Sequence, residues 1–302
     1  MLGISKQAVH KYLKRQDIFD KKLNELIIQV DELRSEHPGC GLEKMYYTLR
    51  PDFIGRDRFI EEFKDLGYGV QRVKNYTRTT IPAHLKYPNL IEGMQVIGIN
   101  QVWQTDITYF RLKGVFYYLV FMLDVYTRKI ISYKVSDNLR AEANIWVLKQ
   151  AIKLRGGKRN LSGLIHHSDR GSQYIAQEYI GLLKGNNINI SMGLKGQENA
   201  YAERVNGIIK NEYLKRWEIN SFEELKRKLR EAVNHYNEKR IHSSLPDRLS
   251  PNAFEMLLNS EYKEVRPKEI IYSENGKKAF KVSQYFKLED EPNGYNCPLV
   301  CP

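Results

Sequence analysis

The stretch from Val102 to Phe110 reads Val-Trp-Gln-Thr-Asp-Ile-Thr-Tyr-Phe, and its apolar and polar residues alternate as they do in a β-strand. Gln104 and Asp106 fall on one face of this strand, whereas Trp103 and Thr105 fall on the other. An aspartate inside a strand needs a reason, because strand interiors disfavour Asp. The pattern therefore predicts a chemical role for Asp106.

The elements that follow this strand predict the fold class. The residue patterns indicate further strands at 115–126, 130–135, 164–167 and 188–192, and helices at 141–154, 174–184 and 199–214. The nearly continuous apolar run at 115–126 is typical of a central strand that is buried on both faces. The order β-β-β-α-β-α-β-α predicts an α/β fold, with a ribonuclease-H-like mixed five-stranded sheet flanked by helices.

The residues before this core are predicted to be helical. Ser5 is placed to cap a basic helix that begins at Lys6, and the preceding Gly-Ile-Ser turn resembles the second half of a helix-turn-helix motif. An ordinary amphipathic helix is the alternative. Further helices at 20–35, 42–49 and 57–66 suggest an N-terminal helical, helix-turn-helix-like DNA-binding region, or else a small helical packing domain.

These patterns predict five segments along the chain. They are a partial helix-turn-helix with its connecting helix at 1–35, a helical DNA-binding domain at 36–78, a linker at 79–98, the α/β core at 99–258 and a C-terminal extension at 259–302. A further helix at 222–236 falls inside the core segment. The linker assignment rests on two prolines and weak periodicity.

The charge of the chain points to a polyanionic partner. The 302 residues carry a formal net charge of +12, and residues 91–220, with 18 Lys/Arg and 11 Asp/Glu, contribute +7 of it. A generally basic surface without a nucleic-acid partner is the alternative. Three cysteines, Cys40, Cys297 and Cys301, argue against a disulfide framework and fit a reducing cytosol. We find neither a signal peptide nor an apolar run of 18 residues, so we expect a cytoplasmic protein without a membrane partner.

Two more carboxylates lie at positions that suit metal-dependent phosphodiester chemistry. Asp169 follows the strand at 164–167, and Glu203 lies on the helix at 199–214. Two divalent ions roughly 3.5–4 Å apart can activate the attacking and leaving oxygens of a phosphodiester, and Mg²⁺ or Mn²⁺ prefers carboxylate ligands. Alternatively, Asp169 or Ser172 caps the next helix, and Glu203 belongs to a solvated face. The combination of Asp106, Asp169 and Glu203 favours a metal site.

The helix at 199–214 has two distinct faces on a helical wheel. Its polar sector contains Asn199, Glu203, Asn206, Gly207 and Lys210, whereas Tyr201, Ala202, Val205, Ile208, Ile209 and Tyr213 fall opposite. We expect the apolar face to pack and Glu203 to point outward. Lys210 is placed to bind a phosphate as a point charge.

Several of these motifs resemble a known protein family. The sequences Asp106-Ile-Thr-Tyr, His-Ser-Asp-Arg-Gly-Ser-Gln-Tyr from His167, and Asn-Ala-Tyr-Ala-Glu from Asn199 resemble the catalytic signatures of bacterial insertion-sequence transposases. These are the group with a retroviral-integrase-like D-D-E core, insertion-sequence family three. Residues 236–255 resemble the C-terminal signature of that core, and the resemblance covers about residues 36–256. It also suggests a downstream-frame product, because a separate upstream frame often supplies a helix-turn-helix segment in this family.

The chain departs from the family in one spacing. Asp169 and Glu203 are separated by 33 residues, two fewer than the family usually has. The loop at 195–199 is shortened, while Asn199 stays aligned with the family pattern. Glu198 is therefore an alternative to Glu203 as the third carboxylate.

The resemblance implies a DNA transposase that cleaves terminal inverted repeats to give a 3′-hydroxyl and then transfers the strand. It implies two Mg²⁺ or Mn²⁺ ions per active site, held by Asp106, Asp169 and Glu203, and a homo-oligomer in a synaptic complex with double-stranded terminal-repeat and target DNA. Residues expected to contact DNA are Lys210, Arg204, Arg170, Asn199, Arg240, Lys6, Lys11, Arg56 and Arg58. A non-catalytic DNA-binding regulator and a plain nuclease of the same fold are the alternatives.

Overall fold

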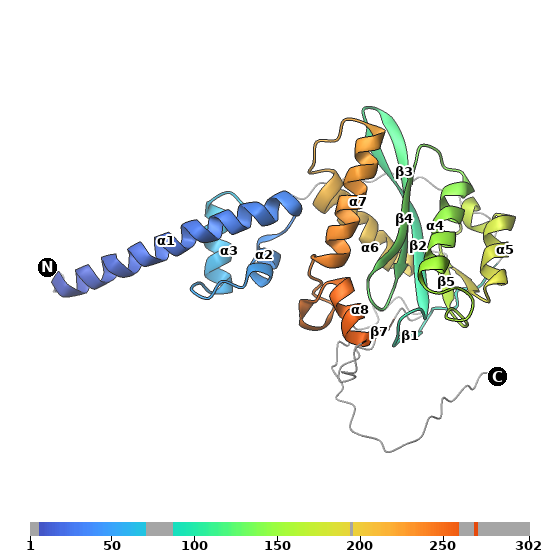
Figure 1. Ribbon diagram of the computed structural model, residues 1–302, viewed down its shortest axis with the longest axis horizontal. Coiled ribbons are helices and arrows are strands. Elements are labelled where there is room, and N and C mark those ends of the chain that lie inside the picture. Colours follow the sequence, from blue (N-terminus) through green and yellow to red (C-terminus); the bar gives the residue numbers. More distant parts are fainter. Residues whose placement is uncertain (1–5, 71–86, 194–195, 260–268, 271–302) are drawn as a thin grey trace, which may run out of the picture. The chain divides into compact units, whose positions relative to one another are not determined.

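The computed structural model describes residues 6–70, 87–193, 196–259 and 269–270 (Figure 1). The chain divides into two compact units. The helical unit contains Met1–Thr79, Leu112–Val115 and Asn206–Tyr236, and the sheet unit contains Thr80–Arg111, Phe116–Val205 and Asn237–Pro302. The segment after Val205 thus belongs with the N-terminal helices and not with the sheet.

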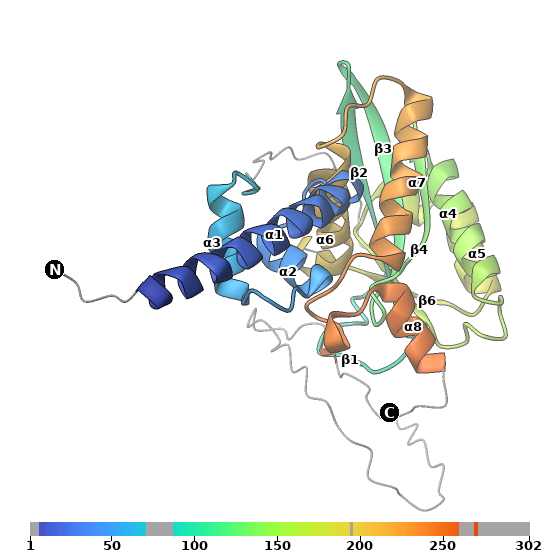
Figure 2. The same ribbon diagram turned by 60° about the vertical axis from the view of Figure 1, so that its left-hand side comes forward.

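The N-terminal helices of the helical unit pack around one apolar cluster. They are α1 (Lys6–Glu36), α2 (Leu42–Leu49) and α3 (Arg56–Asp65). Their buried side chains include Leu26, Val30, Cys40, Met45, Ile54, Phe59 and Phe63. The predicted helices at 42–49 and 57–66 are confirmed to within one residue, while those expected from residue 6 and at 20–35 form the single long helix α1 (Figure 2). The expected turn from Gly3 to Ser5 lies outside the described residues.

The segment between α1 and α2 contacts a later part of the same unit. His37 Nε2 lies 2.6 Å from Glu212 Oε2, and the His37 ring stacks on Tyr213 with ring centroids 4.7 Å apart. The backbone N–H of Gly39 donates to the Glu212 carbonyl at 2.7 Å. Lys44 Nζ lies 3.3 Å from the same carboxylate, so charge and backbone contacts hold this junction together.

The sheet unit contains a five-stranded sheet in the order β4-β3-β2-β5-β6. The strands are β2 (Val102–Leu112), β3 (Val115–Asp124), β4 (Ile130–Ser136), β5 (Ile165–Ser168) and β6 (Asn189–Met192). β3 and β4 pair antiparallel, whereas β2–β5 and β5–β6 pair parallel. The turn between β2 and β3 is formed by Lys113 and Gly114, both with positive φ, as a two-residue hairpin requires. The predicted mixed five-stranded sheet is confirmed.

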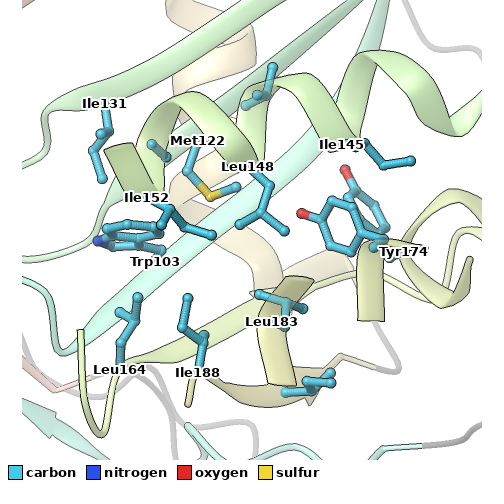
Figure 3. Close-up of a cluster of buried hydrophobic side chains, with 14 of the residues drawn as sticks. Trp103, Met122, Ile131, Ile145, Leu148, Ile152, Leu164, Tyr174, Leu183 and Ile188 are labelled. Carbon is cyan, nitrogen blue, oxygen red and sulfur yellow. The ribbon is translucent and has the colours of Figure 1, made fainter. Parts of the chain in front are cut away.

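Two helices cover one face of this sheet, α4 (Ala141–Leu154) and α5 (Gln177–Gly185). Figure 3 shows the core between these helices and the sheet, in which Trp103 and Met122 from the strands meet Leu148, Ile152 and Leu183 from the helices. Ile107 of β2 also packs against this core. Because side chains alternate along a strand, Gln104 and Asp106 lie on the opposite face of the sheet. The predicted helix at 174–184 is broken at Ala176 into the 3₁₀ helix η1 (Ser172–Ile175) and α5.

The C-terminal half of the chain contains two features that the sequence does not predict. The expected helix at 199–214 consists of α6 (Ala200–Ile208) and a π-helix, η3 (Ile209–Leu214). Helix α8 (Pro251–Asn259) is not predicted, and its Phe254 is fully buried beside Val102 and Tyr126. The predicted helix at 222–236 is confirmed as α7 (Phe222–Glu238).

Short elements complete the described chain. They are the 3₁₀ helices η2 (Gly196–Asn199) and η4 (Pro246–Arg248) and the strands β1 (Gln95–Val96) and β7 (Glu269–Ile270). β1 and β7 pair antiparallel, so part of the expected linker and part of the expected C-terminal extension form one small sheet. Cys297 and Cys301 lie outside the described residues.

We predict that Gly39→Ala destabilises the protein by about 1–3 kcal/mol, the usual cost of overpacking. A Cβ at residue 39 would lie 2.4 Å from the Glu212 Cα, so two backbone segments would have to separate. Gly69→Ala is the matched control, because its Cβ would meet no atom within 4 Å. Chemical denaturation of both variants measures the difference. Equal stability of the two variants would contradict the close approach at Glu212.

Candidate active site

Asp106 and Asp169 are brought to the same level by the pairing of two parallel strands. The register pairs Gln104 of β2 with His167 of β5. Asp106 and Asp169 each follow two residues later, and so they lie at neighbouring positions where β5 ends. Asp106 lies within β2, is half-buried, and its Oδ1 accepts a hydrogen bond from the Ile107 N–H at 2.9 Å.

The Asp169 carboxylate shapes the turn after β5 and does not cap a helix. Its Oδ1 accepts the Gly171 N–H at 3.0 Å. The residue before η1 is Gly171 and the residue before α5 is Ala176, and neither helix has a side-chain cap. The capping alternative for Asp169 and Ser172 is therefore not supported. Burial raises the pKa of Asp169, and the Gly171 N–H only partly opposes this effect.

Glu203 lies on the exposed side of α6, as the helical wheel predicts. Its pKa is raised, first by desolvation and then by the negative charge of Asp169, so the two carboxylates interact. Asp106 acts on the same surroundings through the buried Tyr174. The pKa of the Tyr174 phenol is raised first by burial and then by the charges of Asp169 and Asp106. Negative charge from three separate elements is therefore concentrated in one region.

Asp169 and Glu203 form no ion pair within the described part of the chain. Their raised pKa values show that the fold holds the ionised carboxylates at a free-energy cost. A divalent cation with a preference for carboxylate oxygens would remove that cost, so the donor chemistry fits Mg²⁺ or Mn²⁺. Among the described residues no group of three His, Cys, Asp or Glu side chains is already close enough to hold a metal ion.

Glu198, the alternative third carboxylate, lies near the ends of β5 and β6. A Cβ added to Gly193 would lie 3.1 Å from Glu198 Oε2 and 3.1 Å from His167 Nε2. The Glu198 side chain therefore lies beside His167, whereas the charge of Asp169 acts on Glu203. This arrangement favours Glu203 as the third member.

The two buried histidines of β5 have structural partners. His166 Nε2 lies 2.8 Å from the Tyr179 hydroxyl, and His167 Nδ1 lies 2.8 Å from Ser191 Oγ. Burial lowers the pKa of His166 to about 3, together with the neighbouring His167, and lowers the pKa of His167 to about 4. Both rings are therefore neutral at physiological pH and add no positive charge to the carboxylate region.

The residues expected to contact DNA have different environments. Arg204, Lys11, Arg56 and Arg58 are exposed, whereas Lys210 and Arg170 are half-buried. In the helical unit, Arg56 pairs with Asp57 at 2.8 Å, and Arg58 lies over the Phe19 ring. The side chain of Lys6 is outside the described residues.

Asn199 and Arg240 are buried, with 2% and 6% of their surface exposed. Asn199 Nδ2 donates to the Thr105 carbonyl at 2.8 Å, and the Arg240 guanidinium lies against the His242 ring. Their positions do not support the expected DNA contacts. The helical wheel predicts an outward position for Asn199 because a wheel describes one helix alone. It does not include the Thr105 carbonyl of β2, which accepts the hydrogen bond from Asn199.

Sequence comparisons connect this geometry with known proteins. Two family models described as Integrase core domain match residues 98–198 and 184–251. The insertion element IS600 31 kDa protein of Shigella sonnei is 31% identical over 265 residues, covering 84% of this chain and 96% of that protein. The chain belongs to the integrase core family of insertion-element proteins. The family resemblance predicted from the sequence is therefore confirmed.

Other relatives extend this picture. The putative transposase for the element IS986/IS6110 of Mycobacterium tuberculosis is 28% identical over 251 residues, covering 79% of this chain and 89% of that protein. The catalytic core of HTLV-2 integrase, solved in complex with magnesium, is also similar to this chain. The match covers 55% of this chain and 98% of the integrase core, with 21% identity and a TM-score of 0.41.

No helix among the described residues is long and apolar enough to cross a membrane.

We predict that Asp169→Asn stabilises the metal-free protein at neutral pH. A raised carboxylate pKa means that folding penalises the ionised form above the folded-state pKa, and the penalty disappears below the ordinary value of 3.8. Asn removes the charge but keeps an oxygen for the Gly171 N–H. In EDTA the melting temperature should rise, by about 2–4 °C for each kcal/mol relieved.

Two further measurements test this explanation. The gain in melting temperature should shrink as the pH falls toward 3.8, because the wild-type carboxylate becomes protonated. Added Mg²⁺ should raise the melting temperature of the wild-type protein more than that of the variant. A variant that melts at or below the wild-type temperature in EDTA would contradict the proposed cost of burying the Asp169 charge.

Proposed function

We propose that this protein is a DNA transposase that cleaves DNA at the ends of its element and joins the released 3′ ends to another strand. The observation that carries the proposal is the position of Asp106 on β2 and of Asp169 directly after the paired strand β5, with the charge of Asp169 acting on Glu203 of α6. All three residues lie in the part of the chain that matches the integrase core. The sequence similarity to insertion-element proteins over most of the chain supports a role in transposition.

The three carboxylates have the chemistry to hold divalent cations. Asp106 would provide a ligand from β2, Asp169 from the residue after β5, and Glu203 would complete the site from α6. Two bound Mg²⁺ or Mn²⁺ ions would stabilise the charge on the attacking and leaving oxygens of an in-line displacement. The role of the chain itself is to keep the three carboxylates together, despite their repulsion, at a fixed position on the sheet.

The reaction consists of a hydrolysis followed by a transesterification. In the first, a water oxygen attacks the phosphorus at the end of a terminal inverted repeat, a new P–O bond forms, and the bond to the 3′ oxygen breaks to give a 3′-hydroxyl and a 5′-phosphate. In the second, that 3′ oxygen attacks a phosphorus in another strand, loses its proton to solvent, and displaces the 3′ oxygen of that strand. Neither step requires a covalent bond to the protein.

The basic residues would position double-stranded DNA around the carboxylates. Arg204 is exposed one residue after Glu203, and Arg170 follows Asp169 directly, so both could contact phosphates next to the cleaved bond. Lys210 lies further along the same helical segment. In the helical unit, Lys11, Arg56 and Arg58 would contribute to recognition of the terminal repeats.

Joining two ends of an element requires both to be held at once. We therefore propose a homo-oligomer in a synaptic complex with the terminal repeats and the target DNA. The protein would act in the bacterial cytoplasm, on the nucleoid. The net charge of +12 favours such contacts with a polyanion.

We predict that Asp106→Asn, Asp169→Asn and Glu203→Gln each reduce 3′-end cleavage and joining by at least about 10²-fold, because each removes a charge that organises the reacting centre. Binding to terminal-repeat DNA should stay within a few-fold of wild type. Oligonucleotides with labelled 3′ ends measure cleavage and joining separately.

Glu198→Gln is the matched comparison, since Glu198 is the other carboxylate before α6. It should retain cleavage, and its loss of activity alongside an active Glu203→Gln variant would reassign the third carboxylate. A wild-type protein that cuts but never joins would be a plain nuclease, and one that binds without cutting in Mg²⁺ would be a regulator. Either result would overturn the proposed function.

A further inference from the structure

We propose that Gln104 is a positioning residue that fixes Glu203 relative to Asp106 by capping helix α6 from the neighbouring strand. This inference rests on the proposed roles of the two carboxylates. Gln104 lies two residues before Asp106 on the same face of β2, and its side chain is fully buried. One short stretch of β2 therefore carries a carboxylate of the site and contacts the helix that carries another.

The Gln104 carboxamide makes three hydrogen bonds around the start of α6. Its Oε1 accepts the backbone N–H groups of Tyr201 at 3.1 Å and Ala202 at 3.2 Å, and its Nε2 lies 3.4 Å from the Glu198 carbonyl. Because α6 begins at Ala200, Tyr201 and Ala202 are its second and third residues. Their N–H groups are the ones that a capping side chain normally satisfies.

The residue that would ordinarily cap this helix has a different partner. Asn199 directly precedes α6 and is a preferred capping residue, but its Nδ2 donates to the Thr105 carbonyl at 2.8 Å. Its Oδ1 makes no hydrogen bond within the described residues. The hydrogen bonds are thus reciprocal. Gln104 of β2 caps α6, and Asn199, directly before α6, donates to the backbone of β2. The chemistry of the partners fixes both amide orientations.

A second contact holds the same turn of α6. The guanidinium of Arg128 lies 4.2 Å from the centroid of the Tyr201 ring, and Arg128 is itself 6% exposed. Tyr201 is therefore held through its backbone by Gln104 and through its ring by Arg128. Glu203 follows two residues later, so its backbone position is set by a turn that is fixed on two sides.

A neutral amide suits this position better than the more usual acidic caps. An Asp or Glu here would accept the same N–H groups but would add a negative charge to a region where the pKa values of Asp169 and Glu203 are already raised. It would also lose the donor that faces the Glu198 carbonyl. Gln supplies the acceptor and the donor without charge, which explains why this residue type matches the site.

The test compares Gln104→Met, which has similar length but no acceptor oxygen, with Gln104→Glu, which keeps the oxygen. Amide hydrogen exchange of the full chain should show faster exchange at Tyr201 and Ala202 in Gln104→Met and retained protection in Gln104→Glu. The Mg²⁺ concentration that gives half of the maximal thermal stabilisation should rise about tenfold in Gln104→Met, the usual effect of a supporting residue on metal affinity. Cleavage in this variant should recover at high Mg²⁺.

Ser250→Ala is the matched control, because Ser250 Oγ accepts the Ala253 N–H at 3.3 Å and caps α8 in the same unit. It should lower the melting temperature and leave the half-saturating Mg²⁺ concentration unchanged. Glu203→Gln should raise that concentration at least as much as Gln104→Met does. If Glu203→Gln has this effect and Gln104→Met does not, Gln104 has only a structural role and the inference is overturned. If Glu203→Gln has no effect, the proposed role of Glu203 fails, and the inference fails with it.

Discussion

The parallel pairing of β2 with β5 is the constraint on which the proposed site depends. It pairs Gln104 with His167, so that Asp106 on β2 and Asp169 directly after β5 each follow a paired residue by two positions. Parallel pairing requires a long crossover, and here the connection from β2 to β5 includes β3, β4 and α4. The core of Trp103, Met122 and Leu148 stabilises that connection and thereby the register. Burial of apolar side chains thus offsets the free-energy cost of burying the Asp169 carboxylate.

The buried hydrogen-bonding side chains near the carboxylates are neutral. His166 and His167 precede Asp169 by three and two residues, and burial keeps both rings uncharged. Gln104 and Asn199 contribute amides, and Tyr174 remains a protonated phenol. A permanently charged neighbour would either neutralise the carboxylates or repel them further. Neutral hydrogen-bonding side chains leave the charge available for a cation from solvent.

The sequence predicts the sheet and the candidate carboxylates well because both depend on local patterns. The alternation around Asp106 has the period of a strand, and the helix at 141–154 has its predicted ends. The roles of Gln104 and Asn199 could not be predicted, because each depends on a partner about 95 residues away in the chain. Helix α8 escapes prediction since its burial, at Phe254, is decided by Val102 and Tyr126. Arg240 was expected at a DNA surface because side-chain charge alone does not show burial.

The π-helix η3 has a consequence for how the chain after Glu203 tolerates change. A π-turn closes its hydrogen bonds over one more residue than an α-turn, so every side chain after Ile208 is rotated from its position on a regular wheel. Loss of a single residue between Ile209 and Leu214 would return the segment to α-helical geometry and would displace Glu212 from its contacts with His37 and Gly39. The extra residue of the π-turn therefore sets the rotation at which Glu212 and Tyr213 meet the segment between α1 and α2.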